Sequence, residues 1–151
     1  MPSGSTLQPI QHSYLSPSFE RAKVVDAMRL GLFSCPPDTP LAYVARMMAT
    51  DRIHLVVVSA LGANHEEPSA WGIVSDLDLA RFANNMAGQT AGSVASTELV
   101  TVAADESLER AAQLMAEHET SHLIVIQPQS GHPVGVLSTL DLAGVLAWSE
   151  R

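Results

Sequence analysis

Positive charge is scarce in this chain. Its 151 residues include eight Lys and Arg residues against sixteen Asp and Glu residues, and the formal net charge is −8. Lys23 is the only lysine. Because proteins bind nucleic acids mainly by neutralising phosphates with basic side chains, this composition argues against a nucleic acid partner.

Cysteines, long apolar runs and targeting signals are also lacking. Cys35 is the only cysteine, so no internal disulfide can form and a reducing compartment is expected. No apolar run is long enough to span a bilayer, and the first residues lack the basic and apolar segments of a signal peptide. No cluster of His, Cys and carboxylate residues has the spacing of a zinc site. We therefore expect a cytoplasmic protein without a membrane association or a metal.

What the chain does contain is a short motif that occurs twice. A Gly-x-x-Ser-x-x-Asp sequence covers residues 72–78 and returns over residues 135–141, 63 positions later. Each copy ends an apolar run and begins a helical pattern, so the Ser stands where a strand gives way to a helix. A helix N-terminus carries unpaired N–H groups and the positive end of the helix dipole, which attract anions.

The segments around the motif are duplicated as well. Helix positions such as Leu41 and Leu108 correspond at a spacing of 67, and we align His54 with His122 at a spacing of 68. Thr39 is the expected N-cap of one helix, and Asp105 begins its counterpart. The expected elements are short helical or extended pieces at 24–28, 32–35, 94 and 99–102, helices at 40–48, 76–86, 105–115 and 140–148, and strands at 54–58, 71–74, 122–126 and 133–137.

This pattern predicts an internal duplication rather than a long array of repeats. Each half is too small to be stable alone, so an α+β fold with two halves packed about a pseudo-twofold axis is expected. We place a flexible arm at 1–20, the first repeat at 21–88 and the second at 89–151.

The duplicated Ser and Asp allow two interpretations. In the structural one, they form a capping box, in which the Ser binds an N–H of the first helical turn and the Asp reaches back. In the functional one, Gly72 and Gly135 leave room for a ligand near the backbone, the Asp accepts hydrogen bonds from ribose hydroxyls, and the Ser with the helix N–H groups holds a phosphate. A cap alone does not require the same Gly in both halves, which favours the functional interpretation.

The order of these segments resembles a tandem pair of cystathionine β-synthase (CBS) domains, also called a Bateman module. The resemblance covers about residues 21–148. The segments that carry it are 24–28, the helix ending at Met48, 53–58 and 72–79 in the first half, and 100–102, 108–115, 120–125 and 135–142 in the second.

The resemblance implies a β-α-β-β-α unit in each half and two ligand sites in a cleft between the halves. In similar proteins the Asp of the motif holds the ribose and the Ser or Thr holds the phosphate, while adenine lies against the brief first strand and the start of the second. The residues expected to bind a ligand are therefore Ser34, Arg52, Ile53, His54, Gly72, Ser75 and Asp78 in the first half, and Thr101, Thr120, Ser121, His122, Gly135, Ser138 and Asp141 in the second.

The resemblance also implies an adenosine-containing regulatory ligand, a homodimer and an unidentified protein partner. Arg52 is the cation expected near the first site, whereas residues 118–119 at the corresponding place are His and Glu. With so few cations, AMP, adenosine or S-adenosylmethionine is expected rather than ATP, unless Mg²⁺ accompanies the polyphosphate. No cofactor is required for such a role.

The same residues allow two other interpretations. One is a ligand-free module for dimerisation and protein interaction, in which the Ser and Asp residues are only helix caps. The other is an enzyme that uses Ser138, His122 or His132, and Asp141 as a triad. Because the chain has no Gly-x-Ser-x-Gly sequence and a capping Ser has its hydroxyl engaged, we expect no catalytic activity.

Overall fold

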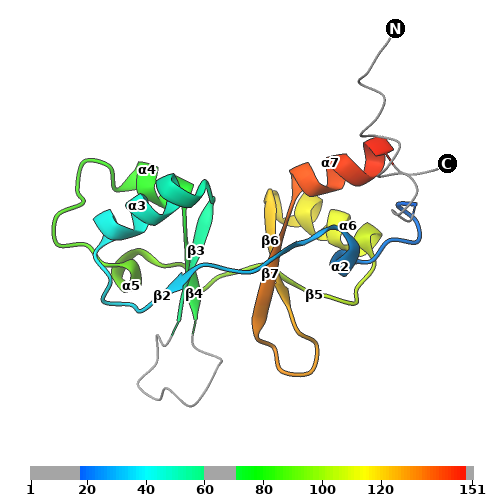
Figure 1. Ribbon diagram of the computed structural model, residues 1–151, viewed down its shortest axis with the longest axis horizontal. Coiled ribbons are helices and arrows are strands. Elements are labelled where there is room, and N and C mark those ends of the chain that lie inside the picture. Colours follow the sequence, from blue (N-terminus) through cyan, green and yellow to red (C-terminus); the bar gives the residue numbers. More distant parts are fainter. Residues whose placement is uncertain (1–17, 60–70, 149–151) are drawn as a thin grey trace, which may run out of the picture. The chain divides into compact units, whose positions relative to one another are not determined.

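A computed structural model describes residues 18–59 and 71–148 (Figure 1). The chain forms two compact units. The central unit lies within Leu32–Leu99, and the terminal unit combines the described residues up to Gly31 with those from Val100 onward. Both units contain helices and a sheet, which confirms the predicted α+β class.

The central unit is built on a three-stranded sheet. Its elements are β2 (Ser34–Cys35), α3 (Leu41–Asp51), β3 (Leu55–Val58), β4 (Gly72–Ser75), α4 (Asp76–Arg81) and α5 (Ala91–Val94). The strand order is β2-β3-β4, with β2 parallel and β4 antiparallel to β3. All four residues of β3 are buried, as expected for a central strand with both neighbours in place.

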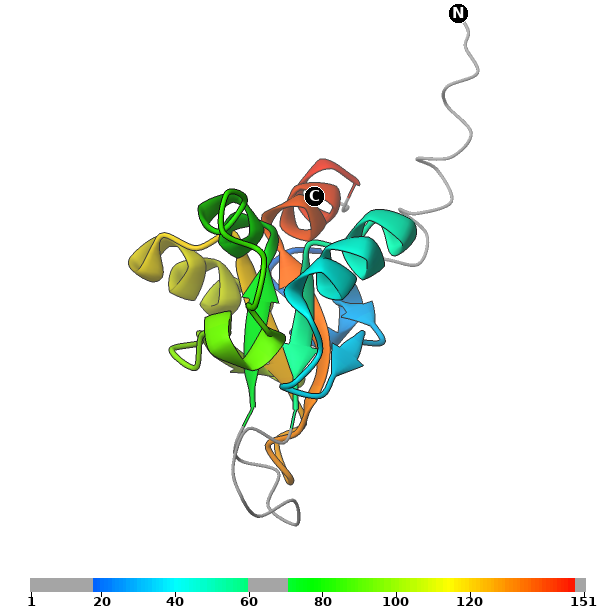
Figure 2. The same ribbon diagram turned by 90° about the vertical axis from the view of Figure 1, so that its left-hand side faces the viewer.

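Helices α3 and α5 cover one face of this sheet, as Figures 1 and 2 show. The apolar stripe of α3 supplies Leu41, Val44 and Met48 to the core, because these residues recur at the spacing of one helix face. They pack with residues of β3 and β4 and with Ala91 and Val94 of α5. The core thus fixes the sheet from which the Ser75–Asp78 step emerges.

The terminal unit repeats this plan with one strand more. Its elements are α2 (Val24–Ala27), β1 (Arg29–Leu30), β5 (Thr101–Ala103), α6 (Leu108–His118), β6 (His122–Ile126), β7 (Pro133–Ser138) and α7 (Thr139–Trp148). The strand order is β1-β7-β6-β5. Helices α2 and α6 lie on the same side of β6 and β7 (Figure 1), where Val24, Leu108 and Leu123 are fully buried.

The opening helices of the two sequence repeats are exchanged between the compact units. The N–H of Val24 in α2 donates to the Glu106 carbonyl at 2.9 Å, next to the start of α6. The N–H of Ala91 in α5 donates to the Thr39 carbonyl at 2.8 Å, next to the start of α3. Each unit therefore contains the opening helix of the other sequence repeat, so the compact units differ from the proposed repeat boundaries at 21–88 and 89–151.

The strand register corrects one predicted alignment. Ser75 pairs with Leu55, and its counterpart Ser138 pairs with His122. His122 therefore corresponds to Leu55, and His54 corresponds to Ser121, at a constant spacing of 67. The spacing of 68 that aligned the two histidines was wrong, because it matched identical residues instead of the alternation of the strands, in which a shift of one reverses every side chain.

Some predicted element ends also differ from the structure. Pro40 is the N-cap of α3 without a side-chain cap, so Thr39 is not the cap. Helix α6 begins at Leu108 after the N-cap Ser107 rather than at Asp105, because the Ser107 hydroxyl accepts the hydrogen bond from the Arg110 N–H. Helix α4 ends at Arg81 rather than at Met86. Most of the predicted arm and the predicted polar loop at 60–69 lie outside the described residues.

Candidate functional site

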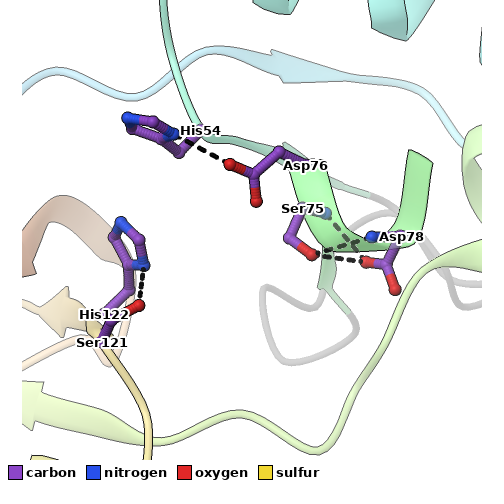
Figure 3. Close-up of polar contacts among 6 residues, drawn as sticks. All are labelled: His54, Ser75, Asp76, Asp78, Ser121 and His122. Carbon is purple, nitrogen blue, oxygen red and sulfur yellow. Dashed lines mark hydrogen bonds and ion pairs between the residues drawn. The ribbon is translucent and has the colours of Figure 1, made fainter. Parts of the chain in front are cut away.

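The two Ser-x-x-Asp steps form the same hydrogen-bonded arrangement. In the central unit, Asp78 Oδ2 accepts the Ser75 N–H at 2.8 Å and the Ser75 hydroxyl at 3.0 Å, while the Asp78 N–H donates to Ser75 Oγ at 3.2 Å (Figure 3). Ser138 and Asp141 repeat all three contacts with the same distances in the terminal unit. Each Ser ends a strand and each Asp lies in the first turn of the next helix.

These contacts leave particular atoms with unused hydrogen-bonding capacity. A Ser hydroxyl has one proton to donate, and in both steps that proton is directed at the Asp carboxylate. Oδ2 already accepts two hydrogen bonds, so Oδ1 is the carboxylate oxygen with accepting capacity left. Such a step can accept hydrogen bonds from a ligand hydroxyl at Oδ1 and at Ser Oγ.

An arginine lies beside each Oδ1 atom. Arg81 Nη1 is 3.5 Å from Asp78 Oδ1, and Arg29 Nε is 3.6 Å from Asp141 Oδ1. The two Asp side chains are 12% and 13% exposed, whereas the arginines are 66% and 65% exposed. In both units a nearly buried carboxylate thus lies beside an exposed guanidinium, whose positive charge offsets that of the carboxylate.

Sequence reasoning missed both arginines. Arg81 follows Asp78 by three residues on one helix, a spacing that places the two side chains on the same face, so the sequence held a signal for it. Arg29 comes from β1, which pairs with β7 through Arg29–Val136 and Leu30–Gly135. This contact between distant segments could not be read from local sequence.

The two motif glycines are buried in strands. Gly72 begins β4 opposite Val58. At Gly135 a Cβ atom would lie 2.5 Å from the Arg29 carbonyl oxygen and 3.2 Å from Met28 Sδ. The close approach that was expected from a ligand at Gly135 is made instead by the backbone of β1.

In the central unit the residues expected around adenine lie at the start of β2 and β3. Ser34 is exposed in β2 opposite Val57, and Ile53 packs on the core. His54 is exposed, and its Nδ1 lies 2.9 Å from Asp76 Oδ2 (Figure 3). Asp76 is the first residue of α4, so this contact brings His54 to the helix end that carries the Ser75–Asp78 step.

In the terminal unit the corresponding residues form a short polar turn before β6. The Thr120 hydroxyl donates to the His122 carbonyl at 3.1 Å, and Ser121 Oγ lies 3.0 Å from His122 Nδ1 (Figure 3). Thr101, in the neighbouring strand β5, pairs with Ile124 of β6. The Thr139 N–H donates to the Ser121 carbonyl at 3.0 Å, which links this turn to the start of α7.

Arg52 and Glu119 occupy the same special position. Both end a helix in the left-handed conformation, with φ of 55° and 51°, and both precede a buried strand. The terminal unit thus has a carboxylate where the central unit has a guanidinium. The positive charge of Arg52 is therefore not repeated in the second half. Arg29 is instead the cation near the Asp of the terminal unit.

The described residues show no assembled triad or metal cluster. Ser138 donates to Asp141 and His122 contacts Ser121, so the Ser138 proton is directed at a carboxylate rather than at an imidazole. Among residues 18–59 and 71–148, no group of three His, Cys, Asp or Glu side chains is placed to hold a metal ion. None of the helices described is long and apolar enough to cross a membrane.

Comparison with known structures identifies the fold. The CBS domain pair of protein MJ0100, in complex with 5′-methylthioadenosine and S-adenosyl-L-methionine, superposes on this chain with a TM-score of 0.69 at 15% identity. The match covers 83% of this chain and 96% of that one. A CBS domain protein from Pyrobaculum aerophilum, complexed with AMP, gives a TM-score of 0.68 at 26% identity, covering 80% of this chain and 90% of that one.

Sequence comparison leads to the same family. A homoserine O-acetyltransferase from Methanosphaerula palustris is 29% identical over 134 residues, which are 87% of this chain and 26% of that protein. The chain thus spans about a quarter of the length of this curated relative. The CBS domain matches twice, over residues 24–85 and 91–147, and the chain therefore belongs to the CBS domain family as a tandem pair.

Proposed function

We propose that this chain is a regulatory module that binds an adenosine-containing ligand at its two Ser–Asp steps. The observation that carries the proposal is the repetition of the same three hydrogen bonds in both units. Structural relatives in complex with AMP, and with 5′-methylthioadenosine and S-adenosyl-L-methionine, support this ligand class.

The ribose is the part of the ligand that suits the steps. Its two hydroxyls are donors, and each step offers Oδ1 of the Asp and a lone pair on the Ser oxygen as acceptors. A phosphate has no proton to donate when fully ionised, and the Ser proton is directed at the Asp. In this proposal Asp78 and Asp141 hold ribose, and Ser75 and Ser138 first of all orient them.

Adenine is assigned to the polar segments beside each step. In the central unit these are Ser34 with Ile53 and His54, and in the terminal unit Thr101 with Thr120 and Ser121. Backbone and hydroxyl groups at a strand edge can read the donors and acceptors on the edge of a base. Gly72 and Gly135 lie in β4 and β7, the strands that lead into the two steps.

The charge of the site favours ligands with few phosphates. Arg52 in the central unit and His122 in the terminal unit are the groups proposed to contact a phosphate, and each could neutralise only part of a triphosphate. We therefore propose AMP, adenosine or S-adenosylmethionine as ligand, with ATP bound only when Mg²⁺ supplies the missing positive charge.

The regulatory role includes a protein partner and a homodimer. Leu77 and Leu140 stand at the same position of α4 and α7 and are 58% and 69% exposed. Paired exposed leucines support self-association through these helices. The acetyltransferase relative, of which the chain matches only a quarter, supports a module that acts on an attached or separate protein.

A second candidate is a ligand-free interaction module. The observation that favours it is the completeness of the capping boxes, because every hydrogen bond between the Ser and the Asp can be explained by helix capping. No catalytic role is proposed in either case.

Ligand binding by the purified protein separates the two candidates. Adenosine, AMP or S-adenosylmethionine should raise the melting temperature with increasing concentration, because a ligand that binds only the folded state stabilises it. Mass spectrometry of the native protein should detect the bound nucleoside. If none of these ligands changes the melting temperature and none is retained, the interaction module is the correct function.

A further inference from the structure

The arginines beside Asp78 and Asp141 come from different parts of the fold. Arg81 lies on α4, the helix that also carries its partner Asp78. Arg29 lies on the edge strand β1, whereas its partner Asp141 lies on α7. The internal symmetry does not preserve either cation, since Ser96 corresponds to Arg29 and Gly144 corresponds to Arg81.

These correspondences follow from the strand register. Arg29 pairs with Val136 of β7, and Ser96 forms the matching bridge with Ile73 of β4. The same edge position is thus filled in both units, but only the terminal unit has a charged side chain there. The two steps have the same internal geometry and different attachments to the rest of the chain.

We propose that Arg29 is a positioning residue that makes the Asp141 site the responsive one of the two. Its ion pair links the Asp141 carboxylate to strand β1, so that a ligand at Asp141 changes the local stability of residues 23–31. A ligand at Asp78 competes only with Arg81 on the same helix and has no such effect. This inference rests on the proposed function and assigns the regulatory step to one site.

The physical basis is that the ligand hydroxyl and Arg29 share a single oxygen, which weakens the ion pair. Oδ2 of Asp141 is saturated by Ser138, so a ribose hydroxyl must use Oδ1, where Arg29 lies at 3.6 Å. Strand β1 has only two residues in the sheet, and Leu30 is 79% exposed. A strand this short depends on each additional contact, so weakening the ion pair loosens it.

Hydrogen exchange of the peptide 23–31 tests the tie without a ligand. Arg29→Gln and Asp141→Asn should each raise its exchange about two- to fivefold, the range expected for a partly exposed ion pair. The matched variants Arg81→Gln and Asp78→Asn should leave it unchanged. The Asn variants keep an oxygen that can accept the capping hydrogen bond, so the fold is preserved. Equal exchange in all four variants would overturn the inference.

Adding adenosine then tests the ligand step. Exchange of this peptide should rise in the wild type and in Arg81→Gln, and should not respond in Arg29→Gln. A response of equal size in Arg29→Gln would also overturn the inference. If calorimetry detects no adenosine binding to the wild type while the ligand-free differences are present, the proposed ligand class fails and the tie between Arg29 and Asp141 stands.

Discussion

Gly135 lies so close to Arg29 that a Cβ at position 135 would be 2.5 Å from the Arg29 carbonyl oxygen. Gly135→Ala must therefore displace β1 or deform β7. We expect this variant to lose about 1–3 kcal/mol of stability, as overpacked sites do. Urea unfolding measures the loss.

Gly144 provides the control for this substitution. It lies within α7, and a Cβ added there would meet no atom within 4 Å outside the backbone of the helix itself. Gly144→Ala should stabilise the protein by about 0.5–1 kcal/mol, because Ala has a higher helix propensity than Gly. Equal effects at the two positions would contradict the packing of β1 on β7.

Asp141→Ala separates capping from ligand binding. Loss of the carboxylate should cost about 1 kcal/mol of stability, a typical capping contribution, and should abolish the thermal shift produced by adenosine at this site. Asp26→Ala is the control, because Asp26 Oδ2 accepts the Lys23 N–H at 2.8 Å at the start of α2, which repeats the backbone contact of the Ser–Asp step without its hydroxyl. That variant should lose similar stability and keep the ligand response. A loss of response in both variants would show that only stability had changed.

The dependence on phosphate number tests the charge of the sites. AMP should bind with similar affinity with and without Mg²⁺, whereas ATP should bind measurably only when Mg²⁺ is present. Calorimetric titrations at constant ionic strength measure both affinities. Tighter binding of ATP than of AMP without Mg²⁺ would contradict the proposed ligand order.

Leu140→Glu tests the proposed homodimer. Leu140 is 69% exposed, so a charge there should weaken association without lowering the stability of the chain. Leu77→Glu should act in the same direction at the equivalent position, and Tyr43→Glu, at an exposed residue of α3, serves as control. Light scattering after size-exclusion chromatography gives the mass. An unchanged dimer in both leucine variants would place the interface elsewhere.

Cys35 gives the folded protein a pH dependence in the alkaline range. Burial raises the pKa of its thiol, with Asp38 acting in the same direction and a hydrogen bond from Thr39 acting against it. Above about pH 8.5, where cysteine ionises in an unfolded chain, the unfolded state loses its proton before the folded state does. Stability should therefore fall as the pH rises through this range.

Comparison with Cys35→Ala isolates this contribution. The difference in unfolding free energy between the wild type and the variant should shrink between about pH 7.5 and about pH 9.5 in urea titrations. Native Cys35 should also react more slowly with a thiol reagent than the unfolded chain does, because the reactive species is the thiolate. A constant difference across this pH range would contradict the raised pKa.

The sequence predicted most of the elements, because the apolar stripes of α3 and α6 and the apolar run of β3 are strong local signals. It also located both Ser–Asp steps. It could not predict which repeat each opening helix joins, since Val24 and Ala91 find their partners through long-range hydrogen bonds. Arg29 was missed for the same reason, and the histidines were misaligned because sequence identity replaced strand register.

The exchange of the opening helices determines which fragments of this chain can fold separately. In chain order, Leu32–Leu99 is an insertion within the terminal unit. A fragment cut at the sequence repeats would leave both halves without the helix that covers the start of α3 or α6. A fragment cut at Leu32 and Leu99 would keep a whole core, so each ancestral copy has become dependent on its duplicate for completion.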